Sequence, residues 1–163
     1  KPLIGRINGP AYAGGLGLIS VCDIAIGLDS SPFSITEARL GLMPAMISPY
    51  VMRRVGVAKA RRLFLNGKRF TAQEAMQYGL LDRIVPAAEL DAAVEEEIAL
   101  VLQCAPGAVA TIKRLIDYVA AHEFTDNFMY TVDRIADMWD DAEAQEGLTS
   151  FVEKRKPSWA IKG

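Results

Sequence analysis

The first part of the chain alternates short apolar runs with a helical stretch, and this order constrains the fold more than any other feature. Apolar residues dominate 3–7 ("LIGRI") and 23–28 ("DIAIGL"), and a helix is predicted between them, from Gly14 to about Cys22. Parallel strands need such crossover connections, whereas antiparallel strands can be joined by a hairpin. The strands alternate only weakly between polar and apolar residues, which indicates burial on both faces. The sequence therefore predicts an α/β fold with a helix-covered parallel sheet.

Further short elements complete this part of the chain. Thr71 and Glu74, three residues apart, form a capping box that marks the start of a helix. The other predicted elements are a short one at 32–35, a helix in "VAKARRLFLNG" that ends at Gly67, closure of the capped helix at Gly79, and a strand at 80–85 stopped by Pro86. We therefore assign residues 1–86 to a β/α part.

The remainder, residues 87–163, is predicted to be helical throughout. Apolar residues recur there at helical spacing in four stretches, and Pro106-Gly107 and the "HEFTDN" segment separate some of them. Neither an internal repeat nor a low-complexity tract interrupts the order. The chain is thus predicted to consist of a β/α part followed by a set of packed helices.

Composition excludes several classes of function. The 163 residues carry 18 basic and 20 acidic side chains, so the net charge of −2 offers no general attraction for nucleic acid. One histidine, His122, and two distant cysteines provide no metal-ligand spacing and no disulfide framework. We expect two buried thiols in a reducing cytoplasm, no metal and no resident cofactor.

The chain begins with Lys1, directly ahead of an apolar run. A natural N-terminus rarely starts inside a strand, so we expect that an N-terminal part of the parent protein is missing. No run of about 18 uncharged apolar residues is present, so no membrane span is expected.

Three glycines precede and enter the predicted helix in "GPAYAGGLGLIS": Gly14, Gly15 and Gly17. Backbone N–H groups at a helix start lack intrahelical acceptors, and glycine lets a ligand approach them closely. Gly14 and Gly15 could therefore form half of an oxyanion hole, which stabilises negative charge on a carbonyl oxygen. A tight strand-to-helix turn or close helix packing would also explain them.

Together with motifs further along the chain, these residues resemble the enoyl-CoA hydratase/isomerase (crotonase) family. The family pattern N-G-x-A-x-G-G-G, a helix ending in C-D-I, and E-x-x-L-G-L-x-P are matched by "NGPAYAGGLG", "CDI" and "EARLGLMP". Further matches are "LFLNGKRFTAQEAMQYGLLDRIVP" and "EGLTSFVEKRKPSW". The resemblance implies the C-terminal part of a spiral of ββα units, followed by a helical region that forms trimers, often paired into hexamers.

The resemblance also implies an acyl-CoA thioester as substrate, with coenzyme A entering as part of it. The N–H of Gly14 would hold the thioester oxygen, and a second donor would come from a loop upstream of Lys1. Typical family hydratases use two carboxylates, which fall at positions 17 and 37. Here these residues are Gly17 and Glu37. We therefore expect Glu37 to manage the protons alone, with a roomier pocket at Gly17. A solvated glutamate in a loop is the other interpretation of Glu37.

The segment after Glu37 also departs from the family's usual P-G-x-G-G-T loop. It reads "PAMISPYV", similar to a bacterial subgroup that acts on branched or carboxylated enoyl-CoAs, such as methylglutaconyl-CoA hydratases. Ser48 and Tyr50 would face a polar acyl group or pack within the loop. The resemblance assigns Phe151 and Lys154 to a neighbouring subunit's substrate, with Lys154 near a CoA phosphate. The expected substrate-binding residues are Gly15, Gly17, Pro44, Ala45, Ser48, Tyr50, Phe151 and Lys154.

Three functions are compatible with these residues. The leading hypothesis is an acyl-CoA lyase that reversibly adds water to a 2-enoyl-CoA. A 3,2-enoyl-CoA isomerase is the alternative, because a single carboxylate suffices to shuttle a proton. A non-catalytic acyl-CoA binder is the third, and the near-neutral charge disfavours an RNA-binding role.

Overall fold

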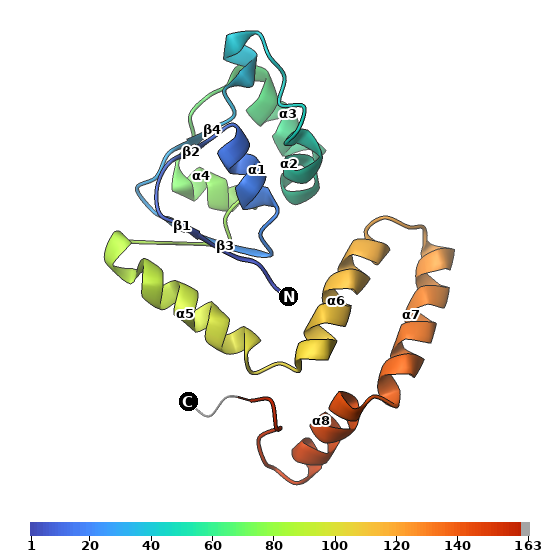
Figure 1. Ribbon diagram of the computed structural model, residues 1–163. Coiled ribbons are helices and arrows are strands. Elements are labelled where there is room, and N and C mark those ends of the chain that lie inside the picture. Colours follow the sequence, from blue (N-terminus) through green and yellow to red (C-terminus); the bar gives the residue numbers. More distant parts are fainter. Residues whose placement is uncertain (161–163) are drawn as a thin grey trace. The chain divides into compact units, whose positions relative to one another are not determined.

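The computed structural model describes residues 1–160, and the chain packs as two compact units (Figure 1). One unit, here called the β/α unit, comprises Leu3–Glu97. The other, the helical unit, begins at Ile98 and also includes Lys1–Pro2. The predicted mixture of a parallel sheet and helices is confirmed.

The main sheet of the β/α unit contains three parallel strands in the order β1-β3-β5. Their bounds are Ile4–Ile7, Ile24–Leu28 and Arg83–Val85. Two aspartates close the sheet in the same way. Asp23 forms two hydrogen bonds with Leu3, and Asp82 forms two with Ala25. In each pair the aspartate carboxylate accepts the partner's backbone N–H, and the aspartate's own N–H donates to the partner's carbonyl. Each aspartate thereby fixes the register of a neighbouring strand.

A second, two-stranded parallel sheet pairs β2 (Ala11–Tyr12) with β4 (Phe33–Ser34). Phe33 also forms an antiparallel bridge with Phe70, and the two rings stack at 5.9 Å between centroids. Phe33, Ser34 and Ile35 are all fully buried. The small sheet is therefore anchored in the core of the unit, although each strand has only two residues.

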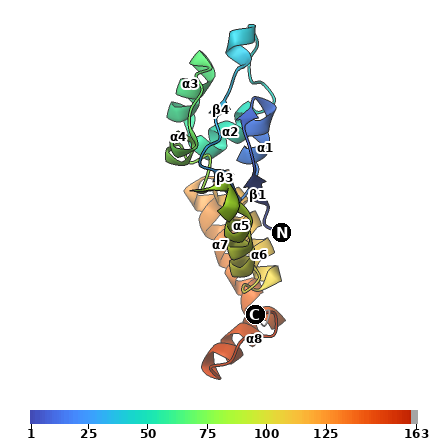
Figure 2. The same ribbon diagram turned by 90° about the vertical axis from the view of Figure 1, so that its left-hand side faces the viewer.

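Helices cover these sheets, and their ends follow local sequence signals. They are α1 (Gly14–Ser20), the 3₁₀ helix η1 (Glu37–Leu40), α2 (Ser48–Val55), α3 (Val57–Asn66) and α4 (Ala72–Gln77). α1 lies beside α2 (Figure 1, Figure 2). The predicted capping box is confirmed, because Thr71 and Glu74 each bond the other's backbone N–H. Gly67 ends α3 with a φ of 58°, in the left-handed region that glycine adopts at low cost.

Arg54 of α2 is a structural centre of this unit. Its side chain is only 12% exposed. Its guanidinium donates to the carbonyls of Cys22, Gly79 and Leu80 and pairs with Asp82 at 2.7 Å. A single side chain thus connects α2 with the end of α1 and with the segment before β5.

The division between the two units falls within α5 (Leu90–Val101), which follows the short 3₁₀ helix η2 (Ala87–Glu89). It differs from the boundary expected after residue 86, because Leu90 and Ala93 are buried against Ile26 and Val85 of the sheet. The first part of α5 therefore belongs to the β/α unit.

The helical unit contains α6 (Pro106–Val119), α7 (Phe124–Trp139) and α8 (Ala142–Val152). Stacked rings join the first two helices. The centroid of the Tyr118 ring lies 3.8 Å from that of His122 and 3.7 Å from that of Tyr130, and the ring planes are nearly parallel. The lone histidine is thus a packing residue of the α6–α7 connection. The expectation of two buried thiols is wrong: Cys104, three residues after α5, is exposed, and Cys22 is half-buried.

Many large apolar side chains of the helical unit are exposed, among them Ile116, Phe124, Phe128, Ile135 and Trp139. Within residues 1–160, no single helix is long and apolar enough to cross a membrane. Among the described residues, one pair of helices has the length and apolar composition of a membrane span when the two are taken together: Ala87–Val101 and Pro106–Val119, which are bent by 100° relative to each other.

Candidate active site

Gly14 and Glu37 are brought to one edge of the small sheet because β2 and β4 run parallel. Gly14 follows the end of β2 and begins α1, and Glu37 follows β4 and begins η1. The carboxyl ends of parallel strands meet at the same edge of a sheet. A bond from the N–H of Ala13 to the carbonyl of Ser34, 3.0 Å long, ties the two segments together just beyond the strands. The two residues predicted to carry the chemistry thus come from adjacent segments.

The turn before α1 holds an unusual backbone conformation. Ala13 has a φ of 48° and a ψ of −116°, a region that residues with a side chain rarely adopt. Its carbonyl accepts the N–H of Leu16 at 3.0 Å and therefore points into the helix. Because a trans peptide directs C=O and N–H to opposite sides, the N–H of Gly14 points away from α1. A Cβ added at Gly14 would meet nothing within 4 Å, so the space beside this residue is open.

Glu37 has one carboxylate oxygen, Oε2, that is buried and has no hydrogen-bond partner among the described residues. Buried polar atoms are nearly always hydrogen-bonded, because leaving one unpaired costs free energy. The residue as a whole is half-buried, and its backbone carbonyl accepts the N–H of Leu42 at 3.0 Å. Glu37 is therefore not the solvated loop glutamate of the alternative interpretation.

Gly15 and Gly17 have packing roles that the sequence did not distinguish. A Cβ at Gly15 would lie 3.2 Å from the Cβ of Ala11, which keeps α1 close to β2. Gly17 is buried, and a Cβ there would lie 2.6 Å from Cγ2 of Ile47. The expectation of a roomier pocket at Gly17 is wrong, because the side chain of Ile47 fills that space. The sequence marked Ile47 only as part of a segment that departs from the family loop, and it did not predict the contact with Gly17.

The segment predicted as a loop through residue 51 is a tight turn followed by α2. Ser48 donates its N–H to Pro44 and its hydroxyl to the carbonyl of Ala45, at 2.9 and 3.0 Å. Its hydroxyl hydrogen is therefore committed to the turn. Tyr50 lies on α2 with 52% of its surface exposed. Pro44, Ala45 and Ser48 form one structural turn, and Tyr50 lies beyond it on the helix.

Phe151 and Lys154 belong to the helical unit and lie at the end of α8. Phe151 is 83% exposed. Lys154 is exposed, has a φ of 54°, and donates its N–H to the carbonyl of Phe151. This left-handed residue ends the helix and turns the chain back, so both side chains stand on its surface.

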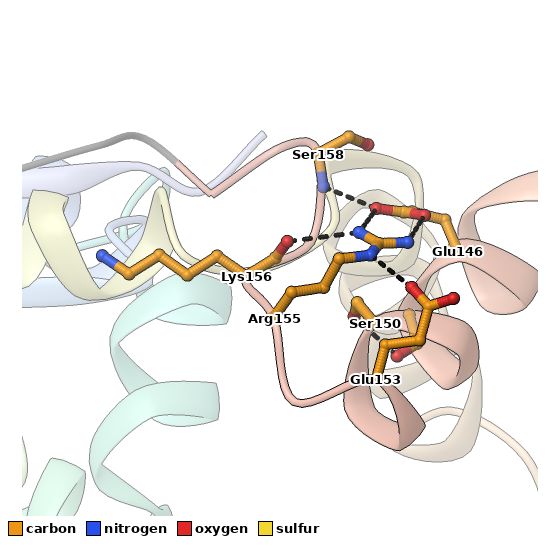
Figure 3. A network of polar contacts seen from close by, with 7 residues as sticks. Glu146, Ser150, Glu153, Arg155, Lys156 and Ser158 are labelled. Atoms are coloured by element: carbon orange, nitrogen blue, oxygen red, sulfur yellow. Dashed lines mark hydrogen bonds and ion pairs between the residues drawn. The ribbon is translucent and has the colours of Figure 1, made fainter.

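The chain after Lys154 is held by a network around Arg155 (Figure 3). The guanidinium makes a two-bond pair with Glu146 at 2.7 and 2.8 Å and reaches Glu153 at 2.6 Å. Ser158 donates its N–H to Glu146 at 2.8 Å. The bonds from Arg155 and Ser158 lower the pKa of Glu146 to about 2 and raise the pKa of Arg155. The network fixes the segment that carries Lys154 onto α8.

A hollow of about 640 Å³ lies among α6, α7 and α8, within the helical unit. Apolar and small residues dominate its lining, with Trp139 and Trp159 on its walls. Glu143, which also lines it, accepts the N–H groups of Gly107 and Ala108. Across the described residues, no three His, Cys, Asp or Glu side chains gather closely enough to hold a metal ion.

Comparison with known proteins identifies the family to which this chain belongs. The profile of the enoyl-CoA hydratase/isomerase family matches residues 1–162, and the chain therefore belongs to that family. It is 34% identical over 168 residues to a carnitinyl-CoA dehydratase of Proteus mirabilis, covering 98% of this chain and 63% of that protein.

Solved structures agree with the sequence relatives. An enoyl-CoA hydratase from Shewanella pealeana superposes with a TM-score of 0.90 at 39% identity, over 98% of this chain and 60% of the other. One from Mycobacterium smegmatis gives a TM-score of 0.92 at 28% identity, over 98% and 62%. The crotonase fold is thereby confirmed. This chain spans somewhat less than two thirds of each of these proteins.

Proposed function

We propose that the protein containing this chain is an acyl-CoA lyase that reversibly adds water to a 2-enoyl-CoA. The observation that carries the proposal is the buried Oε2 of Glu37, which has no hydrogen-bond partner among residues 1–160, at the edge where Gly14 also lies. A carboxylate oxygen without a partner is available to exchange protons with a substrate, and such positioned acid–base groups contribute roughly 10²–10⁴-fold in rate. Two relatives named above are enoyl-CoA hydratases, and a third is a dehydratase.

Gly14 is the proposed donor to the thioester oxygen. Its N–H points away from α1, and the open space beside its Cα lets a carbonyl approach closely. Negative charge develops on that oxygen when water adds to the double bond, and a preorganised N–H stabilises it. The second donor is proposed to lie in the part of the protein upstream of Lys1.

In the proposed reaction, Glu37 accepts a proton from water as the water oxygen bonds to Cβ. The π electrons move toward Cα and the thioester oxygen, giving an enolate held by Gly14. Glu37 then returns the proton to Cα, so one water molecule has been added and the carboxylate is regenerated. Neither step changes the redox state of a cofactor. Coenzyme A accordingly enters as part of the substrate.

The alternative is a 3,2-enoyl-CoA isomerase, which one observation favours. Position 17 is a glycine and Ile47 fills the space beside it, so no second carboxylate stands at that position. Moving a double bond requires only that one group removes a proton from one carbon and returns it to another. A non-catalytic acyl-CoA binder is the remaining possibility.

Other features of the proposal come from the resemblance. The acyl group is proposed to be branched or carboxylated, and the protein to work as a homotrimer or hexamer in the cytoplasm. Phe151 and Lys154 would then contact a neighbouring subunit's substrate, with the mobile charge of Lys154 suited to a CoA phosphate. Their exposure on the end of α8 is consistent with such a role.

The deciding experiment follows loss of the enoyl-thioester absorbance in the full-length protein and in its Glu37→Gln variant. We expect Glu37→Gln to lower the hydration rate by roughly 10²–10⁴-fold, because the amide cannot accept the proton. Glu95→Gln, the same change at an exposed position of α5, is the matched control and should retain the wild-type rate.

Other outcomes identify the alternatives. Conversion of a 3-enoyl-CoA into a 2-enoyl-CoA, without hydration by the wild type, would replace the lyase with the isomerase. Tight acyl-CoA binding without turnover, unaffected by Glu37→Gln, would establish the binder.

A further inference from the structure

The chain between Glu37 and α2 returns onto α1, and Ile47 makes the contact. A Cβ built at Gly17 would lie 2.6 Å from Cγ2 of Ile47 and 3.0 Å from its Cβ, and the three nearest atoms all belong to Ile47. Real Cβ contacts below 3.0 Å are essentially never seen. Ile47 therefore occupies the volume that any side chain at position 17 would need.

Ile47 cannot easily withdraw from this position. It is the N-cap residue of α2, and its carbonyl accepts the N–H of Val51 at 3.0 Å. Val51 is fully buried, and Ile47 itself packs against the same core. The turn before it is tied by the bond from the N–H of Ser48 to the carbonyl of Pro44. The side chain of Ile47 is thus held by the helix after it and by the turn before it.

This apolar side chain lies next to the candidate active site. Gly17 is three residues after Gly14 on α1, and residues at this spacing share a helix face, less than one turn of about 5.4 Å apart. Glu37 begins the same chain segment that Ile47 ends. Ile47 therefore contacts α1 three residues after Gly14, the proposed donor to the thioester oxygen.

We propose that Ile47 determines which acyl groups the site accepts. Its β-branched side chain fills the space over Gly17 and presents an apolar wall to the acyl carbons beyond the thioester carbonyl. The wall limits the size of the substituents that those carbons can carry. The inference rests on the proposed function, because it takes an acyl thioester as the ligand.

The test compares two substrates of the full-length protein: unbranched 2-butenoyl-CoA and its 3-methyl derivative. In Ile47→Ala, we expect the ratio of kcat/KM for the branched over the unbranched substrate to rise at least about tenfold, the discrimination that a single methylene provides in an apolar pocket. Ile47→Val, which removes less volume, should shift the ratio less in the same direction, and it keeps the test valid if Ile47→Ala does not fold.

Leu65→Ala is the matched control. Leu65 is an apolar residue of similar size on α3, 77% exposed, and its truncation should leave the ratio unchanged. A ratio that stays constant in folded Ile47 variants would overturn the assignment of Ile47, while the proposed function would stand if Glu37→Gln remained impaired.

A binding measurement distinguishes failure of the proposed activity from failure of the role assigned to Ile47. Calorimetry with butanoyl-CoA and 3-methylbutanoyl-CoA, which cannot be hydrated, reports acyl preference without turnover. If the wild type hydrates nothing but Ile47→Ala shifts the ratio of the two Kd values toward the branched thioester, the proposed activity fails and the role of Ile47 stands. An unshifted Kd ratio, or no binding of either thioester, would overturn the role of Ile47.

Discussion

Arg54 connects segments of the β/α unit that are far apart in the sequence, so its removal should be costly. Replacing it by Met leaves Asp82 and three backbone carbonyls without their donor. We expect Arg54→Met to lower the free energy of unfolding by about 2–3 kcal/mol, as losing hydrogen bonds to a charged group does. Urea denaturation of the full-length protein measures this loss.

The matched control is Arg61→Met, because Arg61 is exposed on α3. A surface substitution of this kind should change stability by no more than about 0.5 kcal/mol. Equal losses for the two variants would contradict the structural role of Arg54. A loss in Arg54→Lys close to that of Arg54→Met would show that the forked geometry of the guanidinium matters, beyond its charge.

At the scale of residues, sequence patterns located Gly14 and Glu37 but not their surroundings. Both stand in motifs with preserved spacing, and parallel pairing of β2 with β4 places them at one edge. The contact between Gly17 and Ile47 could not be predicted, because it depends on how a turn thirty residues along folds back onto α1. The same holds for Arg54, whose partners lie 25 to 32 residues away.

At the scale of elements, the predictions succeeded where the signal was local. The capping box of Thr71, the glycine that ends α3 and the helical spacing of α6–α8 were readable in the sequence and are confirmed. α2 was missed because its start, Ser48-Pro49, lies inside the segment 44–51, which was treated as a loop by comparison with the family. Pro49 near the first position of a helix was the available signal.

The network of Glu146, Arg155 and Ser158 at the end of α8 gives a prediction about how stability depends on pH. The pKa of Glu146 is lowered from 4.5 to about 2 by its bonds with Arg155 and Ser158, so folding favours the ionised form. Its stabilising contribution is therefore complete above about pH 4.5 and is lost as the pH falls through 2. We expect the difference in free energy of unfolding between the wild type and Glu146→Gln to be constant near neutrality and to shrink over that acidic range.

Urea denaturation at a series of pH values measures this difference. Asp126→Asn, a carboxylate-to-amide change in the first turn of α7, is the comparison. A difference for Glu146→Gln that stays constant down to pH 2 would show that the network does not form in solution.

At the scale of the molecule, the exposed apolar residues of α7 are consistent with the proposed homo-oligomer. Phe124 is 82% exposed and Phe128 is 57% exposed. Large exposed apolar residues that lie close together, unlike single scattered ones, mark interaction surfaces. If a second copy covers this surface, Phe128→Asp should convert the oligomer into smaller species, because a buried unpaired charge is expensive. Sedimentation velocity of the full-length protein measures the change.

Thr125→Asp introduces the same charge at an exposed polar position of α7 and is the control for Phe128→Asp. An unchanged sedimentation coefficient for Phe128→Asp would place the subunit contacts elsewhere. The family profile matches residues 1–162. This pair of variants tests the oligomeric state of the whole protein.

The contact between Gly17 and Ile47 also restricts how the sequence can diverge over time. If a lineage first replaces Gly17 by a larger residue, the new Cβ lies 2.6 Å from Cγ2 of Ile47, and the intermediate protein carries that steric clash. A lineage that first replaces Ile47 by a smaller residue leaves a cavity, which costs stability but keeps the backbone in place. Descendants with a side chain at position 17 should therefore arise by the second order of events, and the two positions should change together among relatives.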